Sequence, residues 1–157
     1  MRPWVIALII VVSLLVCCCG GTVLMGGTAF MKGSQDIGEG KAWAQRTIPT
    51  LAKPWSEEEV WKVSSELYRA SMSRERHDRF IRTLKNGLGD LVELGEPTTQ
   101  NWNVSTTTRR GTVTILYLEV PAKFKKADAK LLLTLAKKDD RWMIDGLKVN
   151  SDAFLVK

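Results

Sequence analysis

An uncharged run near the start of the chain constrains what this sequence can fold into more than any other feature. Residues from Trp4 to Phe30 include no Asp, Glu, Lys or Arg. The hydrocarbon core of a bilayer takes about 20 apolar residues in a helix, and backbone groups inside lipid must bond within the segment itself. Because the run is longer than this minimum, the sequence predicts a transmembrane signal-anchor helix over residues 1–31.

The charges that flank the run predict its orientation. Arg2 and the terminal amine precede it, and Lys32 and Lys41 follow it. A short basic start that leads directly into an apolar run is typical of an uncleaved signal-anchor, and no A-x-A site ends the apolar region. We therefore expect a single-pass protein of the cytoplasmic (inner) membrane, with its domain facing the periplasm or exterior.

Small residues recur at four-residue intervals in this segment, in the two series Ser13, Cys17, Gly21 and Cys18, Thr22, Gly26. Such a face lets two helices approach closely, so it predicts a membrane-helix contact with another membrane protein or a second copy. A weakly hydrophobic end near the membrane interface is the alternative. The three cysteines at 17–19 are either acylated or merely small and polarisable.

The part of the chain after the apolar run has the size and charge of one ordinary domain. All three cysteines precede it, so a disulfide or thiolate zinc site within the domain is excluded. Of the 23 Lys and Arg residues, Arg2 precedes the run, which leaves 22 against 17 acids. These charges are interspersed, so no stripe for nucleic acid is indicated, and weak attraction to anionic headgroups is compatible with them.

Helices are predicted in the first half of the domain. Residues 32–40 (KGSQDIGEG) are expected to form a polar tether, and the domain itself to span 41–157. Apolar spacing from Ala42 to Leu51 favours a first helix that Pro49 kinks or ends. Ser56 followed by three Glu residues predicts a capped second helix. A third, amphipathic helix is marked by the apolar residues Phe80, Ile81, Leu84 and Leu88. Gly87 and Gly89 are expected to end it.

Strands are predicted in the second half. The expected segments are Trp102–Thr108, Thr112–Val120 ended by Pro121, Ala129–Lys137 and Arg141–Val149, with turns at 109–111 and 139–140. Helices followed by strands predict an α+β domain in which helices pack on a curved four- to five-stranded antiparallel sheet. The expected core comprises Trp43, Phe80, Ile81, Leu84, Leu116, Leu118, Leu133, Leu135 and Ile144.

Several local features together resemble a known superfamily. They are Trp43 with Ile48-Pro49, the Lys53-Pro54-Trp55-Ser56 entry, the Leu88-Gly89 helix end, and a closing hairpin from Leu133 to Asn150. Over residues 35–157 the chain resembles membrane-anchored or secreted bacterial domains of unknown function in the nuclear transport factor 2-like superfamily, the cystatin-like α+β cone. It is more faintly similar to cytochrome-oxidase assembly factors. The resemblance implies a fold and leaves the activity open.

Candidate sites are few. Enzymes of the cone fold use a carboxylate, Tyr or His in the pocket, and the resemblance points to Tyr68, Tyr117 and Asp145, with Trp142 as a pocket wall. Each has a structural alternative, either core packing or a bend in the strand. His77, the only histidine, is expected on a solvated helix face among charged neighbours. Residues 57–59 are interpreted as a helix start, and no metal or cofactor is expected.

Two function classes remain at this point. The first is a membrane-tethered, non-enzymatic protein-binding or assembly module, such as an accessory subunit of a larger membrane complex. The second is a small apolar ligand carrier or a cone-fold enzyme with a pocket lined by Trp and Tyr. Acid–base catalysis needs titratable groups gathered in an apolar pocket, and the sequence offers only scattered ones. We therefore expect the first class.

Overall fold

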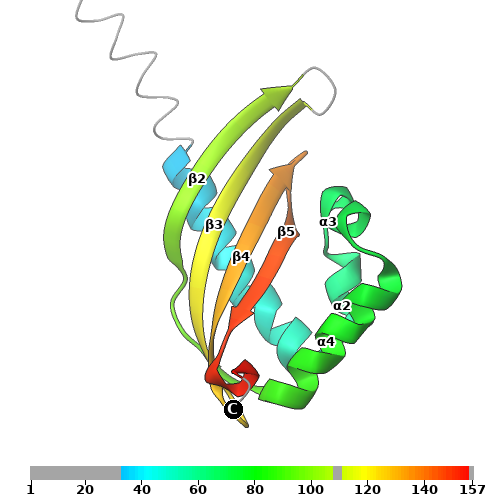
Figure 1. The fold of residues 1–157 in the computed structure, drawn as a ribbon. Helices are drawn as coiled ribbons and strands as arrows, with labels where there is room; N and C mark the ends of the chain where they lie inside the picture. The colour runs from blue at the N-terminus through cyan, green and yellow to red at the C-terminus, as the bar shows by residue number, and fades with distance from the viewer. Residues whose placement is uncertain (1–32, 108–110, 156–157) are drawn as a thin grey trace, which may run out of the picture. The chain divides into compact units, whose positions relative to one another are not determined.

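The computed structural model describes residues 33–107 and 111–155, and residues from Ile37 onward form one unit. A helix over residues 33–52 comes first (Figure 1). The following elements are α2 (Glu57–Lys62), α3 (Glu66–Ser71), α4 (Arg74–Leu88), β1 (Leu91–Leu94), β2 (Thr98–Thr107), β3 (Gly111–Phe124), β4 (Asp128–Lys138), β5 (Arg141–Asn150) and the 3₁₀ turn η1 (Asp152–Phe154). Helices precede strands, so the predicted α+β class is confirmed.

The five strands form one antiparallel sheet around β3. Strands β4 and β5 follow on one side of β3, whereas β2 and β1 share its other side. The expected break at Pro121 is wrong, because β3 continues to Phe124. Pro121 lies where the neighbour of β3 changes from β2, which ends its pairing at Glu119, to β1, which starts at Ala122. The missing N–H of proline is tolerated at such a gap in the ladder.

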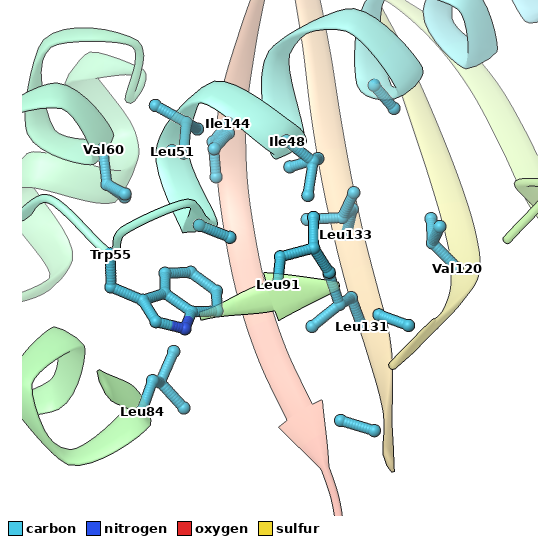
Figure 2. Close-up of a cluster of buried hydrophobic side chains, with 14 of the residues drawn as sticks. Ile48, Leu51, Trp55, Val60, Leu84, Leu91, Val120, Leu131, Leu133 and Ile144 are labelled. Carbon is cyan, nitrogen blue, oxygen red and sulfur yellow. The ribbon is translucent and has the colours of Figure 1, made fainter. Parts of the chain in front are cut away.

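One face of the sheet is buried under the helices. Alternation along β3 and β4 directs Leu116, Leu118, Leu131 and Leu133 inward, and each is at most 1 % exposed. Side chains from the helix over 33–52, from α4 and from β1 meet this face (Figure 2). Of the expected core, Trp43 and Phe80 are only partly buried, whereas the other seven residues are buried.

The expected tether is helical from residue 33 and continues without a break to residue 52. A Cβ added at Gly40 would collide with Leu116 and would lie 3.2 Å from the ring of Trp142. Gly40 therefore permits close approach of the helix to the sheet, where a polar tether was expected. The helix continues through Pro49 to residue 52, so it does not end at that proline.

Helix starts and turns follow the local chemistry of the sequence. Ser56, Ser65 and Ser73 each accept a hydrogen bond from a backbone N–H in the first turn of α2, α3 and α4. Gly89 ends α4 with φ +76°. Asp139 and Asp140 have φ of 50° and 58°, as the tight β4–β5 hairpin requires. The predicted cap at Ser56 and the turn at 139–140 are confirmed.

The short extended segment Val63–Ser65 covers the edge of β5 at Ile144. Ile144 donates its N–H to the carbonyl of Val63, and its own carbonyl accepts from the N–H of Ser65. Ser64 thus forms a parallel bridge with Ile144. The sequence analysis did not anticipate this segment or α3. Pairing here satisfies backbone groups that an edge strand would otherwise leave open.

Within the described ranges, no helix has the length and hydropathy needed to cross a membrane. The uncharged run from Trp4 to Phe30 lies outside those ranges.

Leu84→Asp should unfold the domain. Leu84 is 2 % exposed, so the change removes about 1.5–3 kcal/mol of apolar burial and adds an unpaired carboxylate in the core. The matched control is Leu67→Asp on α3, where the side chain is 49 % exposed. Circular dichroism with thermal melting should show a cooperative transition for the control only. A cooperative melt for Leu84→Asp would remove α4 from the core.

Candidate functional site

The outward face of the sheet carries an apolar surface centred on Tyr117. Tyr117 lies between the buried Leu116 and Leu118 and is 41 % exposed, so its ring points away from the helices. Strand register places other half-buried apolar residues on the same face, namely Val113, Ile115, Leu132 and Met143. In Figure 1 the described helices lie behind or beside the strands and leave this face uncovered. We call these five residues the outer patch.

Ion pairs border the outer patch toward the β1 end of the sheet. Lys130 contacts Glu119 at 3.0 Å, and Lys123 contacts Glu93 at 2.8 Å. These pairs bridge neighbouring strands and are largely solvated, so each contributes little to stability. Their main effect is to give the apolar surface a polar rim.

Asp145 is held by a helix start. It is the extra residue at a register shift in β5, between the pairs Thr134–Gly146 and Leu135–Ile144. The hydroxyl of Ser65 donates to Asp145 at 2.5 Å and accepts from the N–H of Tyr68 at 3.0 Å. The expected role of Asp145 at a bend in the strand is therefore observed, and its carboxylate bonds to α3.

Trp142 lies on the helix-facing side of β5. It lines a hollow of about 540 Å³ between the helix over 33–52 and the β4–β5 turn, together with Trp43 and Arg46. Lys137 lies 5.8 Å from the Trp142 ring centroid and pairs with Glu39 at 2.6 Å. Neither Tyr117 nor Asp145 lines this hollow. Tyr117 therefore lies on the outward face, Trp142 on the helix-facing side and Asp145 on the edge strand β5. The three candidate pocket residues do not line one pocket.

His77 is fully buried, so the expectation that it lies on a solvated helix face is wrong. Its Nε2 lies 3.0 Å from the carbonyl oxygen of Glu57, and its Nδ1 lies 3.2 Å from the hydroxyl of Tyr68. A carbonyl only accepts, so Nε2 carries the proton and Tyr68 donates to Nδ1. The ring also contacts Trp61, with 5.0 Å between centroids. Both nitrogens of the only histidine are therefore engaged in joining α2, α3 and α4.

Tyr68, a candidate from the resemblance, belongs to the same buried cluster. It is 3 % exposed, and burial raises the pKa of its phenol above the ordinary value. A neutral phenol that donates to His77 is the form this environment favours. Tyr68 thus acts in packing and hydrogen bonding between α3 and α4.

A second hollow, of about 810 Å³, lies at the other end of the sheet near η1. Its wall mixes apolar side chains with charges of both signs: Glu93, Pro121, Lys123, Asp128, Lys130, Val149, Asp152, Phe154 and Leu155. Its size matches the pockets that hold small ligands. No lining residue is a buried charged group that would select one ligand class.

Other expectations concern metals and the membrane segment. Among residues 33–107 and 111–155, no three His, Cys, Asp or Glu side chains gather as metal ligands do. The six small residues expected to form a helix contact, Ser13, Cys17, Gly21, Cys18, Thr22 and Gly26, lie outside the described residues.

The sequence analysis missed the outer patch for a specific reason. Apolar residues occupy both alternating sets of positions in TVTILYLEV, so the sequence favoured core packing for Tyr117, and its 41 % exposure shows that this alternative is wrong. The available signal was Thr134 and Gly146, which pair in register with Tyr117 across β4 and β5. Polar or small partners on a strand face are typical of a solvated side.

Tyr68→Phe should lower the free energy of unfolding by about 0.5–1.5 kcal/mol at pH 7, because His77 loses its hydrogen-bond donor. The raised pKa means that the folded state holds the phenol proton more tightly than the unfolded chain. Wild-type stability is therefore retained below pH of about 10 and falls above it, a loss that Tyr68→Phe lacks. Urea titrations should show that the difference in free energy of unfolding between wild type and Tyr68→Phe is smaller at pH 10.5 than at pH 7. A constant gap would contradict the burial of the phenol.

Comparison with known proteins adds no further constraint on the site. A scan against protein-family models finds no match, and a search of curated proteins finds no significant match. Arguments about function therefore rest on the geometry of the described residues.

Proposed function

We propose that this protein is a membrane-tethered, non-enzymatic binding or assembly module that engages a protein partner through the outer patch. The observation that carries the proposal is an apolar surface with an exposed aromatic centre, Tyr117, on a sheet face that the described helices leave uncovered. The resemblance to membrane-anchored cone domains is compatible with such a role.

The composition of the outer patch fits protein recognition. Tyrosine and methionine are enriched at the centres of protein interfaces, and charged residues are displaced to the rim. Tyr117 and Met143 occupy the apolar part, and the Glu119–Lys130 pair borders it. A tyrosine that is already held on a strand loses little conformational freedom on binding, which makes Tyr117 the expected energetic centre. The partner surface would be apolar at its middle.

The polar groups inside the domain support a non-enzymatic role. A general base must reach a substrate proton, either directly or through one water. His77 is fully buried and its ring nitrogens face Tyr68 and a backbone carbonyl. Asp145 accepts from Ser65, which in turn caps α3. These groups hold elements together, and none of them is directed toward either hollow.

A small-ligand carrier is the second candidate, favoured by the hollow of about 810 Å³ near η1. An apolar ligand would lie against Val149, Phe154 and Leu155. The hollow is lined by Glu93, Lys123 and Lys130 of the polar rim but by none of the five outer-patch residues, so binding there would be indifferent to Tyr117→Lys.

The uncharged run from Trp4 to Phe30 supports attachment to a membrane. We propose that residues 1–31 anchor the chain in the cytoplasmic (inner) membrane and that the domain faces the periplasm or exterior. The small-residue series Ser13, Cys17, Gly21 and Cys18, Thr22, Gly26 would add a helix contact to the same partner or complex.

Tyr117→Lys should abolish recovery of the partner. Full-length protein is purified from its native membrane in mild detergent, and associated proteins are quantified by mass spectrometry. Leu67→Lys on α3 is the matched control, since it introduces the same charge at a residue that is 49 % exposed. The control should retain the partner. Equal recovery with both variants would reject the outer patch, and apolar ligand found by lipid extraction would favour the carrier.

Protease added to intact spheroplasts should digest the domain if it faces outward. Protection in intact spheroplasts, with digestion only after lysis, would place the domain in the cytoplasm and reverse the proposed topology.

A further inference from the structure

Strand β2 presents a long open edge. Within residues 33–107 and 111–155, β2 pairs only with β3, so its other side has no neighbouring strand. Residues 98 and 100–105 are exposed. The strand TTQNWNVSTT contains neither a charged residue nor a proline. Proteins usually protect such an edge with Lys, Pro, a short strand or a covering segment.

The remaining edges of the sheet carry these protections. On the far side, Val63–Ser65 pairs with Ile144 of β5. Strand β1 has only four residues and carries the Glu93–Lys123 ion pair. Among the described edges, β2 is therefore the one that is open to pairing with a further strand.

Two features of β2 fit an open edge. The N–H of Trp102 donates to the side-chain oxygen of its neighbour Asn101 at 2.8 Å. Trp102 and Val104 pair with Leu116 and Thr114, so they lie on the helix-facing side of the sheet. They are nevertheless 39 % and 45 % exposed. The inner apolar layer is therefore incomplete at this edge, where a further strand would cover it.

We propose that β2 pairs with β2 of a second copy, antiparallel about a two-fold axis near Asn103. In this register Asn103 lies opposite Asn103 of the second copy, and Trp102 lies opposite the second copy's Val104. Aromatic and β-branched residues form favourable cross-strand pairs, and each such pair would occur twice. The symmetric pairing joins two five-stranded sheets into one, with the helices of both copies on the same face.

The absence of charge favours a second copy as the occupant. Self-pairing about a two-fold axis sets the residue at the axis opposite its own copy, so a charge at that position would face a like charge. An uncharged strand avoids this repulsion at every position. The inference stands apart from the proposed function, because it uses the edge of β2, whereas the outer patch is centred on Tyr117.

A charge-pair experiment tests the dimer. Full-length wild type, Asn103→Lys and Asn103→Asp are each purified in detergent, and the protein mass in the complex is measured by analytical ultracentrifugation. We expect wild type to have twice the monomer mass, and each variant to shift to the monomer because like charges then face each other. An equimolar mixture of the two variants should recover the dimer, since Lys would face Asp. Recovery also excludes misfolding of the variants.

One variant serves as the control, and three outcomes would contradict the dimer. Leu67→Lys, with the same charge placed on α3, should remain dimeric. A monomeric wild type would overturn the proposal, and a bound foreign polypeptide that Asn103→Lys releases but Tyr117→Lys retains would show a different occupant of the edge. A dimer that persists in Asn103→Lys would assign the contact to another surface, such as the membrane segment. Tyr117→Lys should stay dimeric, so loss of the outer-patch partner leaves the dimer measurable.

Discussion

Alternation along β3 sets the layout of the whole domain. Leu116, Leu118 and Val120 are at most 1 % exposed beneath the helices, whereas Tyr117 between them lies on the opposite face. A shift of one residue in register would exchange the two faces and remove the core. Because β3 pairs with β1, β2 and β4, its alternation is imposed on three of the other strands. The helices, the outer patch and the open edge all take their positions from this strand.

A second constraint is the buried polar cluster that fastens the small helices. His77 joins the backbone of α2 to Tyr68 of α3, and Ser65 joins the start of α3 to Asp145 of β5. Buried polar groups are costly when unpaired, so each partner restricts the positions of the others. The cluster therefore fixes where short helices lie that apolar burial alone would hold less specifically.

Much of the fold could be predicted from local chemistry, but tertiary contacts could not. Ser56 and the pair Asp139–Asp140 carry their structural meaning in a few neighbouring residues. His77 does not, because its burial depends on Tyr68 and Trp61, which arrive from other helices. Gly40 was likewise ambiguous, since a glycine permits both a flexible tether and a close helix-to-sheet contact. Tyr117 was expected in a pocket or in the core, yet it is 41 % exposed on the outer face, which explains why the candidate site was incomplete.

The chain order has a consequence for how the domain is made. Lys137 pairs with Glu39 across 98 positions of sequence, and Ser65 bonds to Asp145 across 80. The helices are synthesised first, yet the sheet face that buries them comes from strands near the end of the chain. Such distant contacts slow folding, because a long stretch of chain must close into a loop before each contact forms. During synthesis the apolar helix faces stay uncovered until the strands have emerged, which leaves them open to chaperones or to aggregation.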